Sequence, residues 1–305
     1  MRVAVIDCGT NTIRLLVADP GEGSTLSEVD RRLELVRLGQ GVDASHRFHP
    51  DALARTFAAV DTYAARIRDL GVDRVRFLAT SAARDVSNRD ELFSGVRDRL
   101  GIEVDVITGD EEARLSYLGA LSGGPVAAGP VLVMDVGGGS TELILGDVDG
   151  SVRVARSLDM GSVRIRERFL AGDPPTDAEI ASARDFVDGL LSASGVPIHE
   201  AATWIGVAGT STSMSAISQG LKAYDRGRVH NSTVEVAEIN TMSEQLLAMP
   251  VVEVMKAYPM LQRLRAEVIC AGALIVARVA ARVGEPMTVR ETDILDGATL
   301  ELLRR

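Results

Sequence analysis

The feature that most constrains the fold is a strand–turn–strand pattern that occurs twice in the chain. Residues 3–19 align with residues 131–147 at a constant offset and without a gap, so that Asp7 coincides with Asp135 and Gly9 with Gly137. Any β-hairpin shares this outline, but the matching Asp-x-Gly turn favours duplication. Repeats this far apart are typical of a duplicated domain, whereas solenoid repeats recur about every 20–50 residues. The pattern therefore predicts two similar halves.

Apolar periodicity predicts strands and helices around these two hairpins. Apolar residues recur at helical spacing between residues 53 and 67, after Pro50, and Thr176 with Glu179 forms the capping box of a later helix. A Gly- and Pro-rich segment at 122–130 is the best candidate for a domain junction. The predicted strands are 1–6, 13–17, 34–38, 75–79, 103–107, 131–134, 143–145, 204–207 (ending at residues 209–212) and 287–289. The predicted helices are 50–70, 110–121, 176–192 and 292–303, with two or three more between 234 and 283.

Charge and composition exclude several classes of function. The 305 residues carry a formal net charge of -10 and only 4% are aromatic, which disfavours nonspecific binding to nucleic acid or to an anionic membrane. The longest apolar stretch, 268–281, is interrupted by Arg278 and is too short to span a bilayer. The two cysteines form no CxxC motif, and the amino terminus lacks the core of a signal peptide. We therefore expect a cytoplasmic protein of two domains whose partners include neither nucleic acid nor a membrane.

The two Asp-x-Gly turns have a composition that suits phosphate binding. Glycine lets the backbone approach an anion closely, and successive N–H groups form an anion-binding nest. The Asp at the strand end supplies a hard oxygen ligand for Mg²⁺, which keeps water ligands and bridges to phosphate. Thr10, Thr12, Ser140 and Thr141 add hydroxyl groups. Neither turn matches the P-loop pattern GxxxxGK[ST], so we expect two facing turns that hold the same phosphates.

A series of motifs, in order along the chain, resembles the exopolyphosphatase and guanosine pentaphosphate phosphatase (Ppx/GppA) family. The resemblance covers essentially the whole chain, and several motifs in the right order are far more specific than any one of them. The motifs are DCGTNTIRL at 7–15, ATSAAR at 79–84, GDEEAR at 109–114, DVGGGSTE at 135–142, LDMGSVR at 158–164, GT at 209–210 and AGA at 271–273.

The resemblance implies a fold and a division into domains. It implies an α/β architecture of duplicated actin-like (ribonuclease H-like) domains, shared with sugar kinases and chaperone ATPases, with the active site in the interdomain cleft. It also implies that the last helix returns to the first domain, which then comprises residues 1–124 and 290–305, while the second comprises residues 125–289. Longer family members carry extra C-terminal helical domains, so this chain resembles the short, two-domain form.

The resemblance also implies roles for particular residues. Glu112 matches the catalytic glutamate that orients or deprotonates water, and a register shift of one residue would give this role to Glu111. The family has Pro-Gly before the arginine that matches Arg265, where this chain has Arg263-Leu264. The implied catalytic residues are Glu112, Arg84 and Glu142. The implied metal ligands are Asp7, Asp135 and Glu142. The implied phosphate-binding residues, of which Arg14 and Arg265 hold the more distal phosphates, are Gly9, Thr10, Asn11, Thr12, Arg14, Gly137, Gly138, Gly139, Ser140, Thr141 and Arg265.

These roles predict an exopolyphosphatase, which hydrolyses the terminal phosphoanhydride of short-chain inorganic polyphosphate and releases orthophosphate. The expected cofactor is Mg²⁺ or Mn²⁺, and a monovalent cation and a homodimer are both left open. The main alternative is hydrolysis of guanosine pentaphosphate to the tetraphosphate, because both substrates present the same terminal anhydride. A regulatory protein that binds the alarmone or polyphosphate with little turnover, and a kinase-type ATPase of the same superfamily, are further alternatives.

Overall fold

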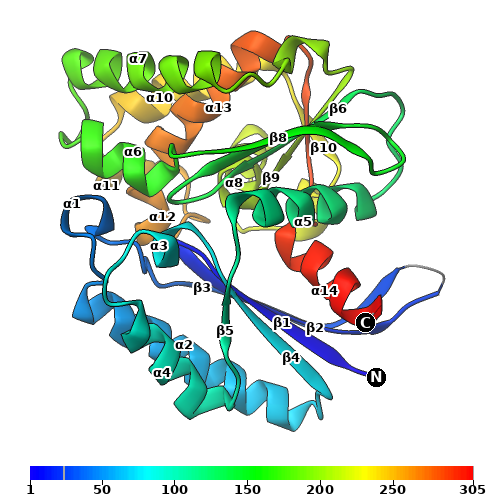
Figure 1. The fold of residues 1–305 in the computed structure, drawn as a ribbon. Coiled ribbons are helices and arrows are strands. Elements are labelled where there is room, and N and C mark those ends of the chain that lie inside the picture. Colours follow the sequence, from blue (N-terminus) through cyan, green and yellow to red (C-terminus); the bar gives the residue numbers. More distant parts are fainter. Residues whose placement is uncertain (23–24, 305) are drawn as a thin grey trace.

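Two mixed β-sheets, each with helices packed against it, form the two halves of the molecule (Figure 1). The computed structural model describes residues 1–22 and 25–304. Within these residues the first sheet has the strand order β3-β2-β1-β4-β5, and the second has the order β8-β7-β6-β9-β11-β10. In each sheet the first two pairs of neighbours in this order are antiparallel and the next two are parallel. The second sheet therefore repeats the first and adds β10 at one edge, which confirms the predicted duplication.

The elements of the first half come from both ends of the chain. Its strands are β1 (Val3–Cys8), β2 (Thr12–Pro20), β3 (Leu26–Leu35), β4 (Arg74–Ala79) and β5 (Val104–Val106), and its helices are α1 (Val42–Ser45), α2 (Pro50–Asp69), α3 (Ser81–Arg84), α4 (Arg89–Leu100), α5 (Gly109–Ser122) and α14 (Ile294–Arg304).

The elements of the second half lie between α5 and α14. Its strands are β6 (Val131–Val136), β7 (Thr141–Gly146), β8 (Val152–Leu158), β9 (Thr203–Val207), β10 (Ser232–Val234) and β11 (Met287–Val289). Its helices are α6 (Ser162–Phe169), α7 (Asp177–Ala193), α8 (Ala208–Ser218), α9 (Arg226–Val229), α10 (Val236–Ala248), α11 (Val251–Ala257), α12 (Arg263–Ala266) and α13 (Ile269–Val283), with a 3₁₀ turn η1 at Ile198–Glu200.

The turns of the two duplicated hairpins have the same hydrogen bond. The N–H of Gly9 donates to the carbonyl of Thr12 at 2.9 Å, and the N–H of Gly137 donates to the carbonyl of Ser140 at 3.0 Å. The strands that enter these turns, β1 and β6, are buried along their whole length. Each turn is therefore held at the end of a rigid central strand.

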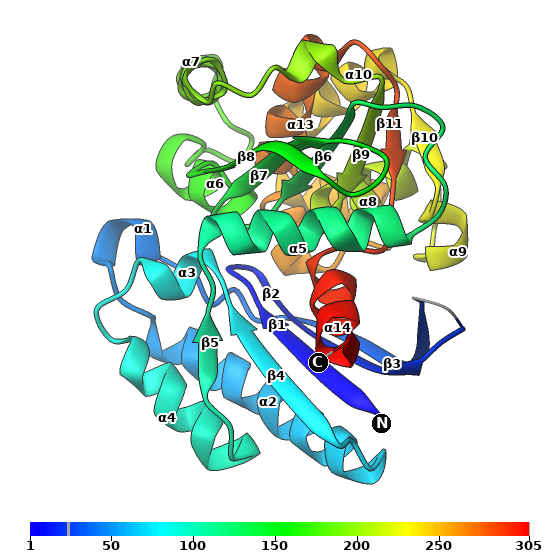
Figure 2. The ribbon, with the colours of Figure 1, turned by 45° about the vertical axis from the view of Figure 1, so that its right-hand side comes forward.

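Helices α5 and α14 join the two halves. Figure 2 shows α5 between the two sheets, with α14 below it. One face of α5, with Ala113 and Tyr117, packs on the second sheet, whereas Leu115 packs with Leu295 of α14 against the first sheet. The last helix thus returns to the first sheet, as expected. The domain boundary at residue 124 stays a prediction, and Arg305, the last residue of the predicted first domain, lies outside the described residues.

The third strand is longer than predicted and lies earlier in the chain. The sequence predicts residues 34–38, but β3 runs from residue 26 and ends at Leu35. Most of its side chains are exposed or half-buried and many are charged, so its apolar alternation is weak. After Leu35 the chain leaves the sheet, because the N–H groups of Val36 and Arg37 both bond to the carbonyl of Asn11.

Several helices also differ from the sequence expectation. Residues 209–212, where the sequence prediction ends a strand, belong to the first part of α8, which begins directly after β9. The segment 234–283 contains α10, α11, α12 and α13 rather than two or three helices, because short helices leave little periodicity. The sequence prediction also lacks α4 and β8, whose side chains are mostly exposed or half-buried. The capping box at Thr176 and Glu179 is confirmed. Among the described residues, none of the helices combines the length and apolar character needed to cross a membrane.

Candidate active site

The two duplicated turns enclose a cavity between the domains, which we call the inner cavity. Its volume is about 80 Å³. The turn from β1 to β2 borders it on one side and the turn from β6 to β7 on the other. The predicted site residues that line it are Asp7, Gly9, Thr10, Asn11, Thr12, Arg14, Glu112, Asp135, Gly137, Gly138, Gly139, Ser140 and Arg265.

The two turns approach each other so closely that only glycine fits at the contact. A Cβ atom on Gly138 would lie 2.9 Å from Cβ of Thr10 and 3.1 Å from the backbone nitrogen of Asn11. On Gly139 it would lie 2.5 Å from Oγ of Ser81. Backbone atoms of the second turn, rather than side chains, therefore border the inner cavity at this point.

Glu112 lies in the inner cavity, with Arg84 beside it. Glu112 is in the first turn of α5 and is 8% exposed. Nη1 of Arg84 donates to the Glu112 carboxylate at 2.8 Å and to the carbonyl of Ile107 at 3.0 Å. Arg84 is not among the described residues that line the inner cavity, so its link to the site runs through Glu112. Glu111 accepts instead from Arg76 at 3.0 Å, outside the cavity.

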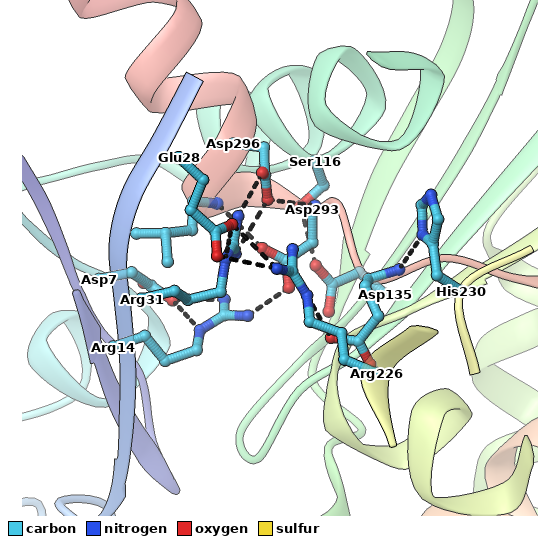
Figure 3. A network of polar contacts seen from close by, with 12 residues as sticks. Asp7, Arg14, Glu28, Arg31, Ser116, Asp135, Arg226, His230, Asp293 and Asp296 are labelled. Atoms are coloured by element: carbon cyan, nitrogen blue, oxygen red, sulfur yellow. Dashed lines mark hydrogen bonds and ion pairs between the residues drawn. The ribbon is translucent and has the colours of Figure 1, made fainter. Parts of the chain in front are cut away.

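Asp7 and Asp135 lie near the ends of equivalent strands, and a third carboxylate, Asp293, lies close to them (Figure 3). Arg14 donates to Asp7 from Nη2 at 2.6 Å and from Nε at 3.1 Å, and its Nη1 donates to Asp293. Asp135 accepts from the hydroxyl of Ser116 at 2.8 Å. The structure therefore places the Arg14 guanidinium on two carboxylates, which differs from its predicted contact with distal phosphates.

Thr141 is not placed to bind phosphate. Its side chain is fully buried, and its hydroxyl donates to the carbonyl of Met160. Successive side chains of an extended segment point in opposite directions. Ser140 therefore faces the inner cavity while Thr141 points away from it, which corrects the predicted role of Thr141.

Glu142 does not belong to the described residues that line the inner cavity. It is 1% exposed, and its carboxylate accepts from the hydroxyl of Ser157 at 2.7 Å. Burial raises the pKa of Glu142 well above its ordinary value, and the charges of Glu112 and Asp135 raise it further. Glu142 therefore interacts electrostatically with Glu112 and Asp135, and its role near the metal or water stays a prediction.

Burial and mutual repulsion shift the titration of the site toward neutral pH. Burial raises the pKa of Glu112 to about 7; the Arg84 guanidinium opposes this shift, while the carboxylates of Asp135 and Asp7 add to it. Burial, with the nearby Asp293 carboxylate, also raises the pKa of Asp135 to about 7. A carboxylate whose pKa lies near the working pH is well matched to general base catalysis.

The carboxylates fit the predicted divalent ion only if other ligands complete its coordination. Within the described residues, no group of three or more His, Cys, Asp or Glu side chains is arranged to hold a metal ion. Mg²⁺ is commonly held by one or two carboxylates together with water and substrate phosphates. Oδ1 of Asp7 is buried and has no hydrogen-bond partner, so it is one available oxygen. Asp7, Asp135 and Glu142 as metal ligands stay a prediction.

A second, larger cavity opens from the inner one, and we call it the outer cavity. Its volume is about 390 Å³, and both cavities share Arg14, Leu33, Ala208, Gly209 and Arg265 in their linings. Its apolar lining comes from Leu33, Leu35, Met260, Leu261 and Leu295.

Arg265 lies where the two cavities meet. Its guanidinium lies so close to Gly209 that a Cβ atom at this position would displace it. Burial lowers the pKa of Arg265, and no carboxylate of the described residues forms an ion pair with it. A half-buried cation without a partner at this junction is suited to an anionic ligand that extends from one cavity into the other.

Several residues of the site have no assigned role in the sequence prediction. Thr80, Ser81 and Thr210 line the inner cavity, and each belongs to a motif that carried the family resemblance. Asp293 and Ser116 belong to none of those motifs. Asp293 immediately precedes α14, so it reaches the site only because the end of the chain returns to the first sheet.

Comparison with known proteins agrees with this geometry. A model of the Ppx/GppA phosphatase family matches residues 16–292. The chain is 45% identical to Exopolyphosphatase 2 of Mycobacterium tuberculosis (strain CDC 1551 / Oshkosh), in an alignment that covers 99% of this chain and 98% of the relative.

Solved structures give the same result. A crystal structure of an exopolyphosphatase-like protein has a TM-score of 0.94 and 38% identity, and the match covers 100% of this chain and 99% of that one. The Ppx/GppA family member of Aquifex aeolicus has a TM-score of 0.83 and 31% identity, with 100% and 98% covered. The predicted α/β class with two duplicated domains is thereby confirmed, and the inner cavity lies between them. The actin-like assignment stays a prediction. With two facing Asp-x-Gly turns, a buried glutamate between them and a family match over nearly its whole length, the chain belongs to the Ppx/GppA phosphatase family.

Proposed function

We propose that this protein is a metal-dependent exopolyphosphatase, which removes the terminal phosphate from short-chain inorganic polyphosphate. The observation that carries the proposal is the buried Glu112 between two turns rich in backbone N–H groups. The 45% identity to a relative named exopolyphosphatase supports it. A protein that only binds polyphosphate has no need of such a carboxylate. We also propose that the protein acts in the cytoplasm.

The terminal phosphoryl group occupies the inner cavity. Its oxygens accept hydrogen bonds from backbone N–H groups of the two turns and from the hydroxyls of Thr10 and Ser140, which line that cavity. These dipoles are fixed by the central strands, so little reorganisation is needed as charge develops on the transferred group. They also supply the local attraction that a chain of net charge -10 lacks at long range.

Glu112 orients the attacking water and accepts its proton. The water oxygen bonds to the terminal phosphorus, and the bond from this phosphorus to the bridging oxygen breaks. Orthophosphate and a chain shorter by one phosphate then leave. Arg84 holds the Glu112 carboxylate in place through the 2.8 Å hydrogen bond and opposes the rise in its pKa. Asp7 and Asp135 would hold a Mg²⁺ or Mn²⁺ ion, which when bound would neutralise charge on the phosphate oxygens.

The rest of the substrate leaves the inner cavity past Arg265. This arginine lines both cavities, so it can contact phosphates beyond the terminal one. The outer cavity favours guanosine pentaphosphate as the second candidate substrate, because its leucine and methionine side chains offer an apolar surface to a base. Inorganic polyphosphate has no group that would use this apolar surface.

The test is phosphate release measured side by side on short polyphosphate, long polyphosphate, guanosine pentaphosphate and ATP, with E112Q as the control for contaminating phosphatases. We expect the highest kcat/KM on short polyphosphate. Preference for guanosine pentaphosphate would move the assignment to the second candidate. Tight binding of both polyphosphates without turnover that depends on Glu112 would instead support a regulatory role. Phosphate transfer from ATP to an acceptor would support a kinase.

A further inference from the structure

The two duplicated hairpins carry opposite charges at equivalent positions. In the first hairpin Asp7 pairs across the strands with Arg14, whereas in the second Asp135 pairs with Glu142. The second hairpin therefore presents two carboxylates, while the first presents a carboxylate and its own cation. A divalent ion near both Asp residues would meet a fixed positive charge on one side only.

The Arg14 guanidinium is held firmly in this position. Its side chain is 15% exposed, and it forms ion pairs with Asp7 at 2.6 Å and with Asp293. Burial alone would lower the pKa of Arg14, but Asp293, Asp7 and Asp135 raise it above its ordinary value. Figure 3 shows the guanidinium between Asp7 and Asp293. The arginine thus supplies positive charge to the carboxylates that a divalent ion would also neutralise.

Of the two carboxylates that hold Arg14, Asp293 is the more firmly fixed. Its Oδ1 accepts from the N–H of Leu295 at 3.0 Å, and its own N–H donates to Asp296 at 3.1 Å, so both its side chain and its backbone are bonded to the first turn of α14. Asp7, in contrast, has a buried Oδ1 without a hydrogen-bond partner among the described residues. Asp7 is therefore the partner that is free to take another cation.

We propose that Arg14 is an internal counter-ion that competes with the divalent metal for Asp7, and that Asp293 is the positioning residue that retains Arg14 when Asp7 changes partner. When the metal takes Asp7, the Nε and Nη2 donors of Arg14 lose their acceptor and become available to a substrate phosphate, while Nη1 stays on Asp293. Metal binding and the predicted phosphate contact of Arg14 are then two consequences of one exchange. This inference rests on the proposed metal dependence.

The first test measures Mn²⁺ binding to the substrate-free protein by electron paramagnetic resonance of the unbound ion. We expect R14Q to bind Mn²⁺ more tightly by roughly tenfold, because it removes a buried charge beside the ion. An arginine that only binds phosphate would leave this affinity unchanged. The matched control is R76Q, since Arg76 is about as buried as Arg14 and pairs with Asp105 and Glu111 rather than with Asp7. Its loss should leave the Mn²⁺ affinity within about twofold.

The second test addresses Asp293 through a double-mutant cycle. D293N keeps an oxygen to cap α14, because Asn caps a helix about as well as Asp, but it loses the charge that retains Arg14. We expect D293N to weaken Mn²⁺ binding, since Arg14 then depends on Asp7 alone. Removing the Asp293 charge also weakens Mn²⁺ binding directly, through space. The informative quantity is therefore the loss of Mn²⁺ affinity caused by D293N in each of two backgrounds, wild type and R14Q. Positioning through Arg14 requires a larger loss in the wild-type background than in the R14Q background.

The outcomes separate this inference from the proposed function. Wild-type protein that binds Mn²⁺, with an unchanged or weaker affinity in R14Q, would overturn the competition while leaving the metal dependence in place. An equal loss from D293N in both backgrounds would overturn the positioning role. Wild-type protein that binds no Mn²⁺ under conditions where it hydrolyses polyphosphate would overturn the metal dependence, and the inference with it.

Discussion

At the scale of single residues, two consecutive glutamates of α5 have different surroundings. Glu112 lies in the inner cavity and Glu111 bonds to Arg76 outside it. We expect E112Q to lower kcat by roughly 10²- to 10⁴-fold with little change in substrate binding, because the amide keeps the size of the carboxylate and loses its basicity. E111Q, the matched control, should stay within about twofold of wild type. Steady-state kinetics of both variants decide the question, and a crippled E111Q with an active E112Q would reverse the roles.

The raised pKa of Glu112 predicts how activity depends on pH. A general base acts in its ionised form, and burial raises the pKa of Glu112 to about 7. We therefore expect kcat/KM to increase as the pH rises through about 7. Because Asp135 titrates in the same range, this limb belongs to the pair rather than to one residue. A pH–rate profile that is flat from pH 5 to 8 in the wild type would contradict the buried base.

The same pKa shift predicts an effect on stability. The pKa of Glu112 is higher in the folded protein than its ordinary value of 4.5, so the folded state binds more protons between these two values. Stability from this group is then fully present below about pH 4.5 and is lost as the pH rises through about 7. The glutamine side chain of E112Q carries no charge at any pH. We therefore expect E112Q to raise Tm at pH 8 and to change it much less at pH 4.5. Thermal melts at the two pH values measure this difference, and equal shifts would argue against a buried charge as the cause.

At the scale of elements, the crossing of α5 and α14 positions both Glu112 and Asp293. The helices touch through two glycines: a Cβ on Gly119 would lie 1.7 Å from the carbonyl oxygen of Asp293, and one on Gly297 would lie 2.0 Å from that of Leu115. No side chain fits at either position without moving a backbone. One helix carries the predicted base and the other begins next to Asp293, so the crossing sets the distance between the two acids.

We expect G297A to destabilise the protein by about 1–3 kcal/mol or more, as overpacking of a rigid contact does. The matched control is G189A in α7, where a Cβ would meet no atom within 4 Å; this change should be neutral or stabilise the protein by up to about 1 kcal/mol. Urea unfolding of the two variants provides the comparison. Equal stabilities would show that α5 and α14 separate without cost.

At the scale of the whole molecule, several arginines between the two domains are paired with carboxylates of the opposite domain. Arg164 of α6 pairs with Asp43 and Asp85 of the first domain, and Arg226 of α9 pairs with Glu28 of β3. These arginines hold the domains together rather than presenting free charge to a polymer. The cationic surface left for a long polyphosphate is therefore local.

We accordingly expect short polyphosphates to be cleaved at least as efficiently, per chain end, as very long ones. The grip comes from the two turns and from Arg265, which has no ion-pair partner among the described residues, and the net charge of -10 offers no wider attraction. Steady-state kinetics across a series of chain lengths measure this. A steep rise in kcat/KM with length, lost when an oligomer is dissociated, would reveal a longer basic path built by two subunits.

The sequence by itself determined the duplicated fold and most of the inner cavity, because these features are local. Each half begins with a buried strand and an Asp-x-Gly turn, so residues such as Asp7 and Gly137 can be assigned from their immediate neighbours. The main local error, Thr141, came from treating a run of hydroxyl residues as one surface when the pleat of a strand turns every second side chain away.

Only the tertiary structure decided which charges meet. Asp293 and Arg14 are far apart in the sequence, and they form an ion pair because α14 returns to the first sheet and starts beside the first turn. The protonation of Glu112 likewise depends on burial and on carboxylates from other segments. Coulomb interactions act through space and strengthen with burial, so neither the pairing of Arg14 nor the pKa of Glu112 can be determined from a local pattern of residues.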